Sequence, residues 1–341
     1  MHAENLRKLG AEVMLVTSDL FPESDRARPY ETVLLGRPVP TAGWLPALGA
    51  YRRARSFRPD VVVTELLRDP RWRPLAELAP RVRMIHDDKP HDGTHTAPWW
   101  NRLFFDRWDA HADATVVFSS YVADTLLSAG TVSPVYVAPL ISDLDAALVP
   151  EFVPAEQRKN FTLVGRQRPY KNHRVVFAAW EAHTQSSAWQ GDELVVIGAG
   201  EIPHPLPSHA RWDQKTFQYR QVIDELACAK GSIVHCRSAS QSGVQVLSMQ
   251  LGVTTLASTA GALPEYQPPG SSTTGIDDIA GLSDALNRLA DPNEAELQGK
   301  TAAQHFAAHF DSHMASSRLL DIFDDVCRSS PVRATRRRWL S

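Results

Sequence analysis

The sequence predicts an α/β protein made of two Rossmann-like, doubly wound domains. Short β-branched runs alternate with segments of helical periodicity along most of the chain, which is the order expected when helices cover both faces of a parallel sheet. The alternation pauses at ALVPEFVPAEQRKN (147–160), where two prolines and mixed charges indicate a linker, assigned to residues 149–160. With 341 residues, the chain is long enough for two ordinary domains.

The first domain is predicted to span residues 1–148. Its strands are expected at 11–18, 60–66, 82–88, 114–120 and 134–140, and its helices at 3–9, 47–57, 99–110 and 121–128. A doubly wound domain ordinarily opens with a strand and a glycine-rich turn before its first helix. We therefore expect either that the first strand of this domain is missing from the sequence or that the domain begins in an unusual way.

The second domain is predicted to span residues 161–311. Its strands are expected at 161–166, 193–200, 233–234 and 253–256, and its helices at about 173–184, 221–230, 243–250, 279–289 and 293–309. Asn293 follows Asp291-Pro292 and is the expected N-cap of the last of these helices.

The predicted C-terminal segment, residues 312–341, holds a helix and a basic aromatic tail, Arg333–Trp339 (RATRRRW). The tail is interpreted either as a solvated end or as a peripheral contact with an anionic membrane surface, such as the inner membrane face.

Composition excludes several classes of protein. A net charge of −3 gives no signature of nucleic-acid binding. The three cysteines, Cys228, Cys236 and Cys327, have no metal or disulfide spacing, so we expect core packing in a reducing compartment, the cytoplasm. The sequence has no run of 18 or more apolar residues, so we expect no membrane-spanning helix.

The most informative segment is SIVHCRSASQSGVQVLSMQLGVTTLASTAGALPEY (232–266), a strand, a Ser/Gly turn, a helix, a second strand and a closing loop. The first amides of a helix lack intrahelical partners and the helix dipole favours negative charge there, so the turn predicts an anion site. The residues expected to contribute are the amides of Gly243 and Val244 and the hydroxyls of Ser240, Ser242 and Ser248, with Glu265 accepting hydrogen bonds from sugar hydroxyls or capping a helix.

Two cations in VGRQRPYKN (164–172) are expected to act with this turn. Gly165 at a strand end allows a ligand to approach the backbone, and Arg166 and Lys171 bracket a proline turn. Two cations above the carboxyl ends of the strands suit a diphosphate leaving group, which gains negative charge as it departs.

The segment HDDKPHDGTH (86–95) is rich in histidine and aspartate. His86 directly follows a strand, at the end where such sheets bind ligands. The spacing matches no metal motif and Lys89 would repel a cation, so we expect no metal site but a loop, including Asp88 and His91, that faces a polar substrate. A solvated turn and a catalytic role for Asp88 or Asp92 are the alternatives.

Two further segments have weaker implications. Gly198-Ala199-Gly200 lacks the third glycine of a dinucleotide motif and favours a close turn that lines a ligand-binding cleft. Residues 212–219 (WDQKTFQY) are interpreted either as an aromatic cover for a nucleobase or as ordinary packing.

The second half resembles the nucleotide-binding half of the family 4 retaining glycosyltransferases, which have the GT-B fold. The resemblance lies in VGRQRPYKN (164–172), VVIGAG (195–200), the helix from Tyr219, SASQSGVQVLSMQLGVTTLASTAGALPE (238–265) and HFDSHMASSRLLDIF (309–323). It implies two Rossmann-like domains facing a central cleft.

The resemblance also implies roles for single residues. Arg166, Lys171 and the amides of Gly243 and Val244 would hold the donor diphosphate, and His86 would lie near the donor sugar as the catalytic residue. The family's two glutamates, eight positions apart, fall on Ser240 and Ser248, so this chain departs from the pattern where the transferred sugar and the ribose are held.

The expected function is therefore retaining, metal-independent transfer of a hexose from a nucleotide-diphosphate sugar to a glycan or lipid-linked acceptor, in polysaccharide or glycolipid biosynthesis. No cofactor is expected beyond the nucleotide sugar as co-substrate. Two alternatives remain open: a catalytically impaired protein that binds a nucleotide sugar or a partner subunit, and a nucleotide-sugar epimerase.

Overall fold

The computed structural model describes residues 2–17, 29–33, 44–65, 70–86, 108, 110–142, 144–217, 219–271 and 273–330. The chain divides into two compact units. The first unit comprises residues 1–118, 122–138 and 313–341, and the second comprises residues 119–121 and 139–312.

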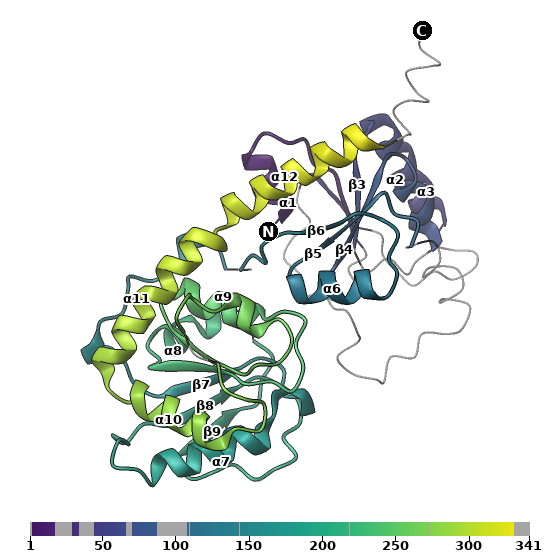
Figure 1. The fold of residues 1–341 in the computed structure, drawn as a ribbon. Coiled ribbons are helices and arrows are strands. Elements are labelled where there is room, and N and C mark those ends of the chain that lie inside the picture. The colour runs from purple at the N-terminus through teal and green to yellow at the C-terminus, as the bar shows by residue number, and fades with distance from the viewer. Residues whose placement is uncertain are drawn as a thin grey trace. The chain divides into compact units, whose positions relative to one another are not determined.

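The first unit contains two parallel sheets (Figure 1). The larger has the order β3-β4-β5-β6, and β1 pairs with β2. The strands are β1 (Leu15–Thr17), β2 (Glu31–Val33), β3 (Val62–Glu65), β4 (Arg81–Ile85), β5 (Ala114–Val117) and β6 (Val135–Val137). The helices are α1 (His2–Lys8), α2 (Trp44–Phe57), α3 (Arg73–Ala76), α6 (Ser120–Ser128) and α12 (Ser312–Ser329), of which the first residues of α6 and α12 are grouped with the second unit.

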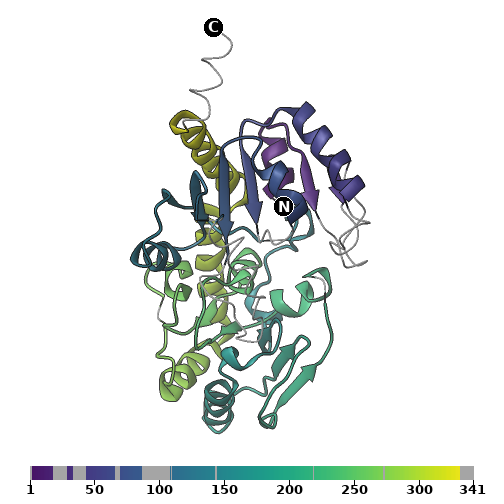
Figure 2. The ribbon, with the colours of Figure 1, turned by 90° about the vertical axis from the view of Figure 1, so that its right-hand side faces the viewer.

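Small apolar residues form the core of the first unit beside β1. Ala47, Ala50 and Ala54 recur on one face of α2, and they pack with Leu75 of α3 and Val16 of β1. Figure 2 shows the strands and helices of this unit from a second side. The predicted strands of this half are confirmed in position but are shorter than expected, and β2 was missed because three residues give too little pattern. The predicted helix at 99–110 lies largely outside the described residues.

The second unit has a five-stranded parallel sheet with the order β11-β10-β7-β8-β9 (Figure 1). The strands are β7 (Phe161–Val164), β8 (Leu194–Ile197), β9 (Ala210–Asp213), β10 (Gly231–Val234) and β11 (Thr255–Ala257). The helices are α7 (His173–Thr184), α8 (Ile223–Ala227), α9 (Gly243–Gln250), α10 (Ile279–Leu289) and α11 (Pro292–His309). The helices predicted at about 173–184, 243–250 and 279–289 are confirmed, and β9 was missed.

Alternating residues of β7 serve two separate cores. Phe161 and Leu163 point to one face, where α7 and α10 lie side by side, whereas Val164 points to the other face, which α8 and α9 cover (Figure 1). Every residue of β7 is buried, as expected for a strand covered on both faces.

The strand order creates a switch point between β7 and β10. From β7 the chain proceeds to β8 and β9 on one side, and it then crosses to β10 and β11 on the other side. The loops that follow β7 and β10 therefore leave neighbouring strands in opposite directions. Open α/β sheets bind ligands in the crevice that forms where two such loops diverge.

One predicted cap is wrong. Asp291, rather than Asn293, is the N-cap of α11, because its carboxylate accepts a hydrogen bond from the amide of Asn293 at 2.9 Å. Pro292 then occupies the first helical position, where its fixed φ and missing N–H are tolerated.

Along the described residues, no helix is long and apolar enough to cross a membrane. In the described part of the chain, Cys228, Cys236 and Cys327 form no disulfide, and Cys236 and Cys327 are buried.

Candidate functional site

The loop after β7 holds a buried lysine. The side chain of Lys171 lies inside the second unit, where its Nζ donates a hydrogen bond to the carbonyl oxygen of Val164 at 2.8 Å. Burial removes water from the ammonium group and lowers the pKa of Lys171. A single carbonyl satisfies one of the three ammonium donors, so this cation has capacity for an anion.

Gly165 and helix α9 border the same ammonium group. Gly165 has a φ of +115°, and a Cβ there would lie 3.1 Å from the Nζ of Lys171 and 3.7 Å from the Cγ2 of Val244. The missing side chain at Gly165 thus leaves room for Lys171 beside the first turn of α9. Sequence reasoning joined these three residues, and the structure brings them together.

The first turn of α9 presents free amides. Ser242 is the N-cap, and its Oγ accepts from the amide of Gln245 at 3.2 Å. The carbonyl of Ser242 accepts from the amides of Gln245 and Val246. For the amides of Gly243 and Val244, the described part of the chain supplies no acceptor. Two open N–H groups at a helix N-terminus, beside a buried cation, form an anion site.

The remaining predicted donor-site residues have different environments. Arg166 is exposed, in contrast to Lys171. Ser240 is buried and its carbonyl accepts from the Oγ of Ser119 at 3.0 Å. Ser248 is fully buried, and its hydroxyl donates to the carbonyl of Val244 at 2.8 Å, one turn earlier in α9.

Glu265 accepts two backbone hydrogen bonds inside the second unit, which includes residues 119–121. Its carboxylate oxygens receive the amides of Ser120 at 2.7 Å and Tyr121 at 2.6 Å. Of the two roles expected for Glu265, this geometry favours capping of backbone amides.

A buried glutamine that the sequence did not reveal supports the loop after β7. The Nε2 of Gln167 donates to the carbonyl of Gly165 at 2.7 Å, and its Oε1 accepts from the Nε2 of His173 at 2.9 Å. Burial, with a smaller contribution from nearby Lys171, lowers the pKa of His173 to about 4. His173 is therefore neutral near pH 7 and acts as a donor to Gln167.

The turn after β8 packs directly against the loop after β7. Gly198 and Gly200 have φ values of +132° and +139°, and a methyl group on either would overlap the carbonyl oxygen of Gly165 or Gln167, respectively. The two glycines thus permit direct backbone contact between neighbouring loops.

Trp212, expected to cover a nucleobase or to pack, has a packing role. It lies on β9, borders the core formed with α7 and α10, and donates from its Nε1 to the carbonyl of Gly198 at 2.9 Å. A concavity of about 410 Å³ lies beside this turn and is lined by Pro169, Gly200, Glu201, Ile202, Pro203, Trp212 and Gln214.

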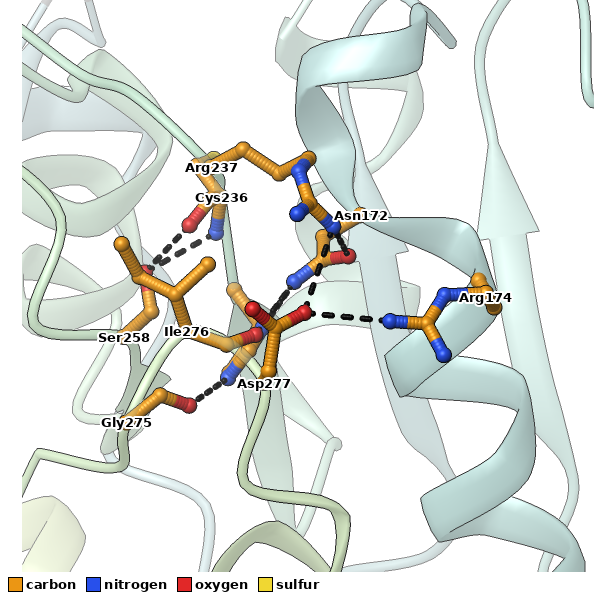
Figure 3. Close-up of polar contacts among 9 residues, drawn as sticks. Asn172, Arg174, Cys236, Arg237, Ser258, Gly275, Ile276 and Asp277 are labelled. Atoms are coloured by element: carbon orange, nitrogen blue, oxygen red, sulfur yellow. Dashed lines mark hydrogen bonds and ion pairs between the residues drawn. The ribbon is translucent and has the colours of Figure 1, made fainter.

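A polar cluster connects the loops after β7 and β10 (Figure 3). The side chain of Asn172 donates to the carbonyl of Ile276 at 2.6 Å and lies 3.3 Å from the Nδ1 of His235. The Oδ1 of Asn172 accepts from Arg237 at 3.0 Å. Arg237 and Arg174 both approach the same oxygen of Asp277, at 3.4 and 3.1 Å. Burial lowers the pKa of His235, which favours the neutral ring that accepts from Asn172 and donates to the carbonyl of Gly275.

His86 belongs to the first unit and has an acidic partner that sequence reasoning missed. Its Nε2 lies 2.8 Å from the Oε1 of Glu65, and its ring stacks on Phe118 at 4.6 Å. The hydrogen bond from His86 lowers the pKa of Glu65. The carboxylate therefore fixes the orientation of the imidazole at the carboxyl ends of β3 and β4.

Two predicted acceptor residues, Asp88 and His91, lie outside the described residues. Among the residues that the structure does describe, no group of histidine, cysteine, aspartate and glutamate side chains could hold a metal ion.

Residues 1–145 match the family model of Glycosyltransferase Family 4. Over these residues the chain is similar to glycosyltransferase family 4. The resemblance predicted from the second half thus agrees with a match that covers the first half. No curated protein sequence matches this chain.

Solved structures confirm the fold that the sequence predicts. Sucrose-phosphate synthase from Thermosynechococcus elongatus is 14% identical, with a TM-score of 0.71 over 96% of this chain and 92% of that chain. A glycosyltransferase from Rickettsia africae is 11% identical, with a TM-score of 0.67 over 96% and 94%. Anabaena HepE is 13% identical, with a TM-score of 0.63 over 86% of each chain. The protein has the GT-B fold, as predicted.

Proposed function

We propose that this protein is a family 4 glycosyltransferase that moves a hexose, with retention of configuration and without a metal ion, from a nucleoside-diphosphate sugar to a glycan or lipid-linked acceptor. The observation that carries the proposal is the buried ammonium group of Lys171 beside the open N-terminus of α9.

A diphosphate would supply the negatively charged hydrogen-bond acceptors that this site lacks. A buried cation is costly unless it is paired, and two amides without acceptors add to that cost. Phosphate oxygens would accept from the Nζ of Lys171 and from the amides of Gly243 and Val244, forming charge-assisted hydrogen bonds. Arg166, which is exposed, would reach the outer phosphate from the solvent side.

The same groups would support bond cleavage. Negative charge develops on the diphosphate as the glycosidic bond to it breaks, and donors that are already in place stabilise this charge without reorganisation. In the reaction that we propose, the acceptor attacks from the face that the diphosphate leaves. A departing phosphate oxygen takes the acceptor proton, so no protein base is needed.

The other predicted residues would act near the donor sugar and the acceptor. His86, oriented by Glu65, would lie near the donor sugar, and Ser240 would approach the sugar from the turn before α9. The loop with Asp88 and His91 would face the acceptor.

The basic tail, Arg333–Trp339, supports a cellular setting for this reaction. A cytoplasmic enzyme of surface polysaccharide or glycolipid assembly would meet the anionic membrane surface peripherally through these cationic and aromatic side chains.

Uridine nucleotides are the first donors to test. The Anabaena HepE structures include complexes with UDP and with UDP-glucose. The fold is shared at low identity, so this choice is a starting point for a panel that also includes GDP- and ADP-sugars.

The test measures donor hydrolysis and transfer with this panel, with and without EDTA, for the wild type and Lys171→Met. We expect turnover of at least one donor that resists EDTA and is lost in the variant. Turnover that requires a divalent cation, or that survives in Lys171→Met, would overturn the proposed mechanism.

A second candidate is a nucleotide-sugar-binding protein without transferase activity. It is favoured by Ser248, which stands where the family has a glutamate and whose hydroxyl is used inside α9. Tight binding of a nucleoside diphosphate, with no hydrolysis or transfer by the wild type, would support this candidate.

A further inference from the structure

Arg237 lies between the end of β10 and the turn that leads into α9. The residue before it, Cys236, is bonded to the residue that follows β11, because the Oγ of Ser258 donates to the carbonyl of Cys236 at 2.7 Å and accepts from its amide at 3.1 Å (Figure 3). The backbone from which Arg237 projects is therefore anchored to the sheet.

Arg237 holds both sequence neighbours of Lys171. Its backbone amide donates to the carbonyl of Tyr170 at 2.7 Å. Its guanidinium donates to the Oδ1 of Asn172 at 3.0 Å (Figure 3). Lys171 lies between these two contacts in the chain, so its backbone is fixed from both sides by one residue of the neighbouring loop.

Asn172 is an unusual position for such a contact. It has a left-handed φ of 52° and precedes the first residue of α7. Both hydrogens of its amide face other acceptors, the carbonyl of Ile276 and the Nδ1 of His235. These contacts fix which way the side chain points, and they leave its Oδ1 toward Arg237.

We propose that Arg237 is a positioning residue that sets the distance between the ammonium of Lys171 and the first amides of α9. The proposal rests on the function proposed above, because these are the groups assigned to the diphosphate. Arg237 is in the loop that ends at the N-cap Ser242, and it grips the loop that carries Lys171. It therefore joins the two halves of the anion site without touching the anion.

Arg174 provides a matched control. It lies on α7, is exposed like Arg237, and contacts the same oxygen of Asp277. Replacing either arginine with alanine removes one positive charge and one contact with Asp277. The side-chain link to Asn172 is lost only in Arg237→Ala.

The test compares wild type, Arg237→Ala and Arg174→Ala in binding to UDP, GDP and ADP and to the corresponding nucleosides, by titration calorimetry. For the diphosphate that the wild type binds most tightly, we expect affinity to fall about tenfold in Arg237→Ala, because small displacements of charged groups weaken binding strongly. Nucleoside affinity should be unchanged, and Arg174→Ala should resemble the wild type for both ligands.

Three outcomes would overturn the role of Arg237. The first is that Arg237→Ala binds the diphosphate like the wild type. The second is that it loses nucleoside and diphosphate affinity equally, which would indicate a general structural effect. The third is that Arg174→Ala loses as much diphosphate affinity as Arg237→Ala, which would indicate an effect of charge alone. Wild-type protein that binds none of the three diphosphates would instead overturn the proposed function, and the positioning role with it.

Discussion

The Nζ of Lys171 donates to the carbonyl oxygen of Val164, so the ammonium group lies against the last residue of β7. This carbonyl ends the central strand of the sheet, next to the switch point of the strand order. The contact satisfies one of the three donors of an ammonium group that lies inside the second unit.

We expect Lys171→Met to separate binding from stability. Methionine keeps the length of the side chain and removes the buried charge, so the free energy of unfolding should stay within about 1 kcal/mol of wild type. Affinity for the bound nucleoside diphosphate should fall about a hundredfold, as for loss of a charge-assisted hydrogen bond. Urea unfolding and calorimetric titration measure the two effects.

Lys215→Met is the control for Lys171→Met. Lys215 is exposed and pairs with Asp213 at 2.7 Å, so it carries the same charge in the same unit but outside the proposed site. Equal loss of affinity in both variants would mean that net charge, rather than the buried ammonium, attracts the diphosphate.

Two serines of α9 should respond differently to alanine. Ser242→Ala removes the N-cap and should lower the free energy of unfolding by about 1 kcal/mol and diphosphate affinity by a few-fold. Ser248→Ala removes a hydroxyl that bonds within the helix, so it should cost less than about 1 kcal/mol and leave affinity unchanged. Thermal unfolding and titration check both variants. A large loss of affinity in Ser248→Ala would instead support the ribose contact that the family resemblance implies.

Gly198→Ala should be among the most damaging small substitutions. Its φ of +132° is strained for alanine, and the new methyl would overlap the carbonyl oxygen of Gly165, so we expect a loss of about 3 kcal/mol. Gly191→Ala has a φ of +89° but open space around it, so it should lose about 1 kcal/mol. Denaturant unfolding of the two variants measures how much stability the overlap with the Gly165 carbonyl costs. Equal losses in the free energy of unfolding would contradict a cost from this overlap.

Stability should fall in acid because of His173. Its pKa is about 4 in the folded protein and 6.5 in the unfolded chain, so the unfolded state binds more protons between these values. The contribution of the neutral ring is complete above pH 6.5 and is lost progressively down to about pH 4. His173→Gln, which can still donate to Gln167, should show a smaller loss between pH 7 and pH 5 in urea unfolding. An identical loss in wild type and variant would contradict this assignment.

The sequence predicted the elements with long or clear periodic patterns. Helices α7, α9 and α10 lie approximately where the sequence predicted them, because their apolar residues recur at helical spacing and a polar residue, Asn172, Ser242 or Asp278, precedes each helix. Strands β2 and β9 were missed because each has only three or four residues, none of them with a pattern that distinguishes a strand from a loop.

Part of the candidate site was predicted and part was not. Gly165, Lys171 and Val244 were named together because strand ends and helix starts are recognisable in sequence, and the fold places them within contact distance. Glu65 was not named beside His86, because its partner is on another strand and no spacing along the chain indicates it.

By itself the sequence determined the alternation of strands and helices, the presence of a helix N-terminus at Gly243 and the cations available to it, since these depend on residue type and local spacing. Only the tertiary structure decided which cation is buried. Lys171 and Arg166 look equivalent in the chain, but the pairing of β7 with β8 and β10 encloses one and leaves the other in solvent. The same pairing brings Arg237 to both neighbours of Lys171, a contact between residues far apart in the chain that no local pattern encodes.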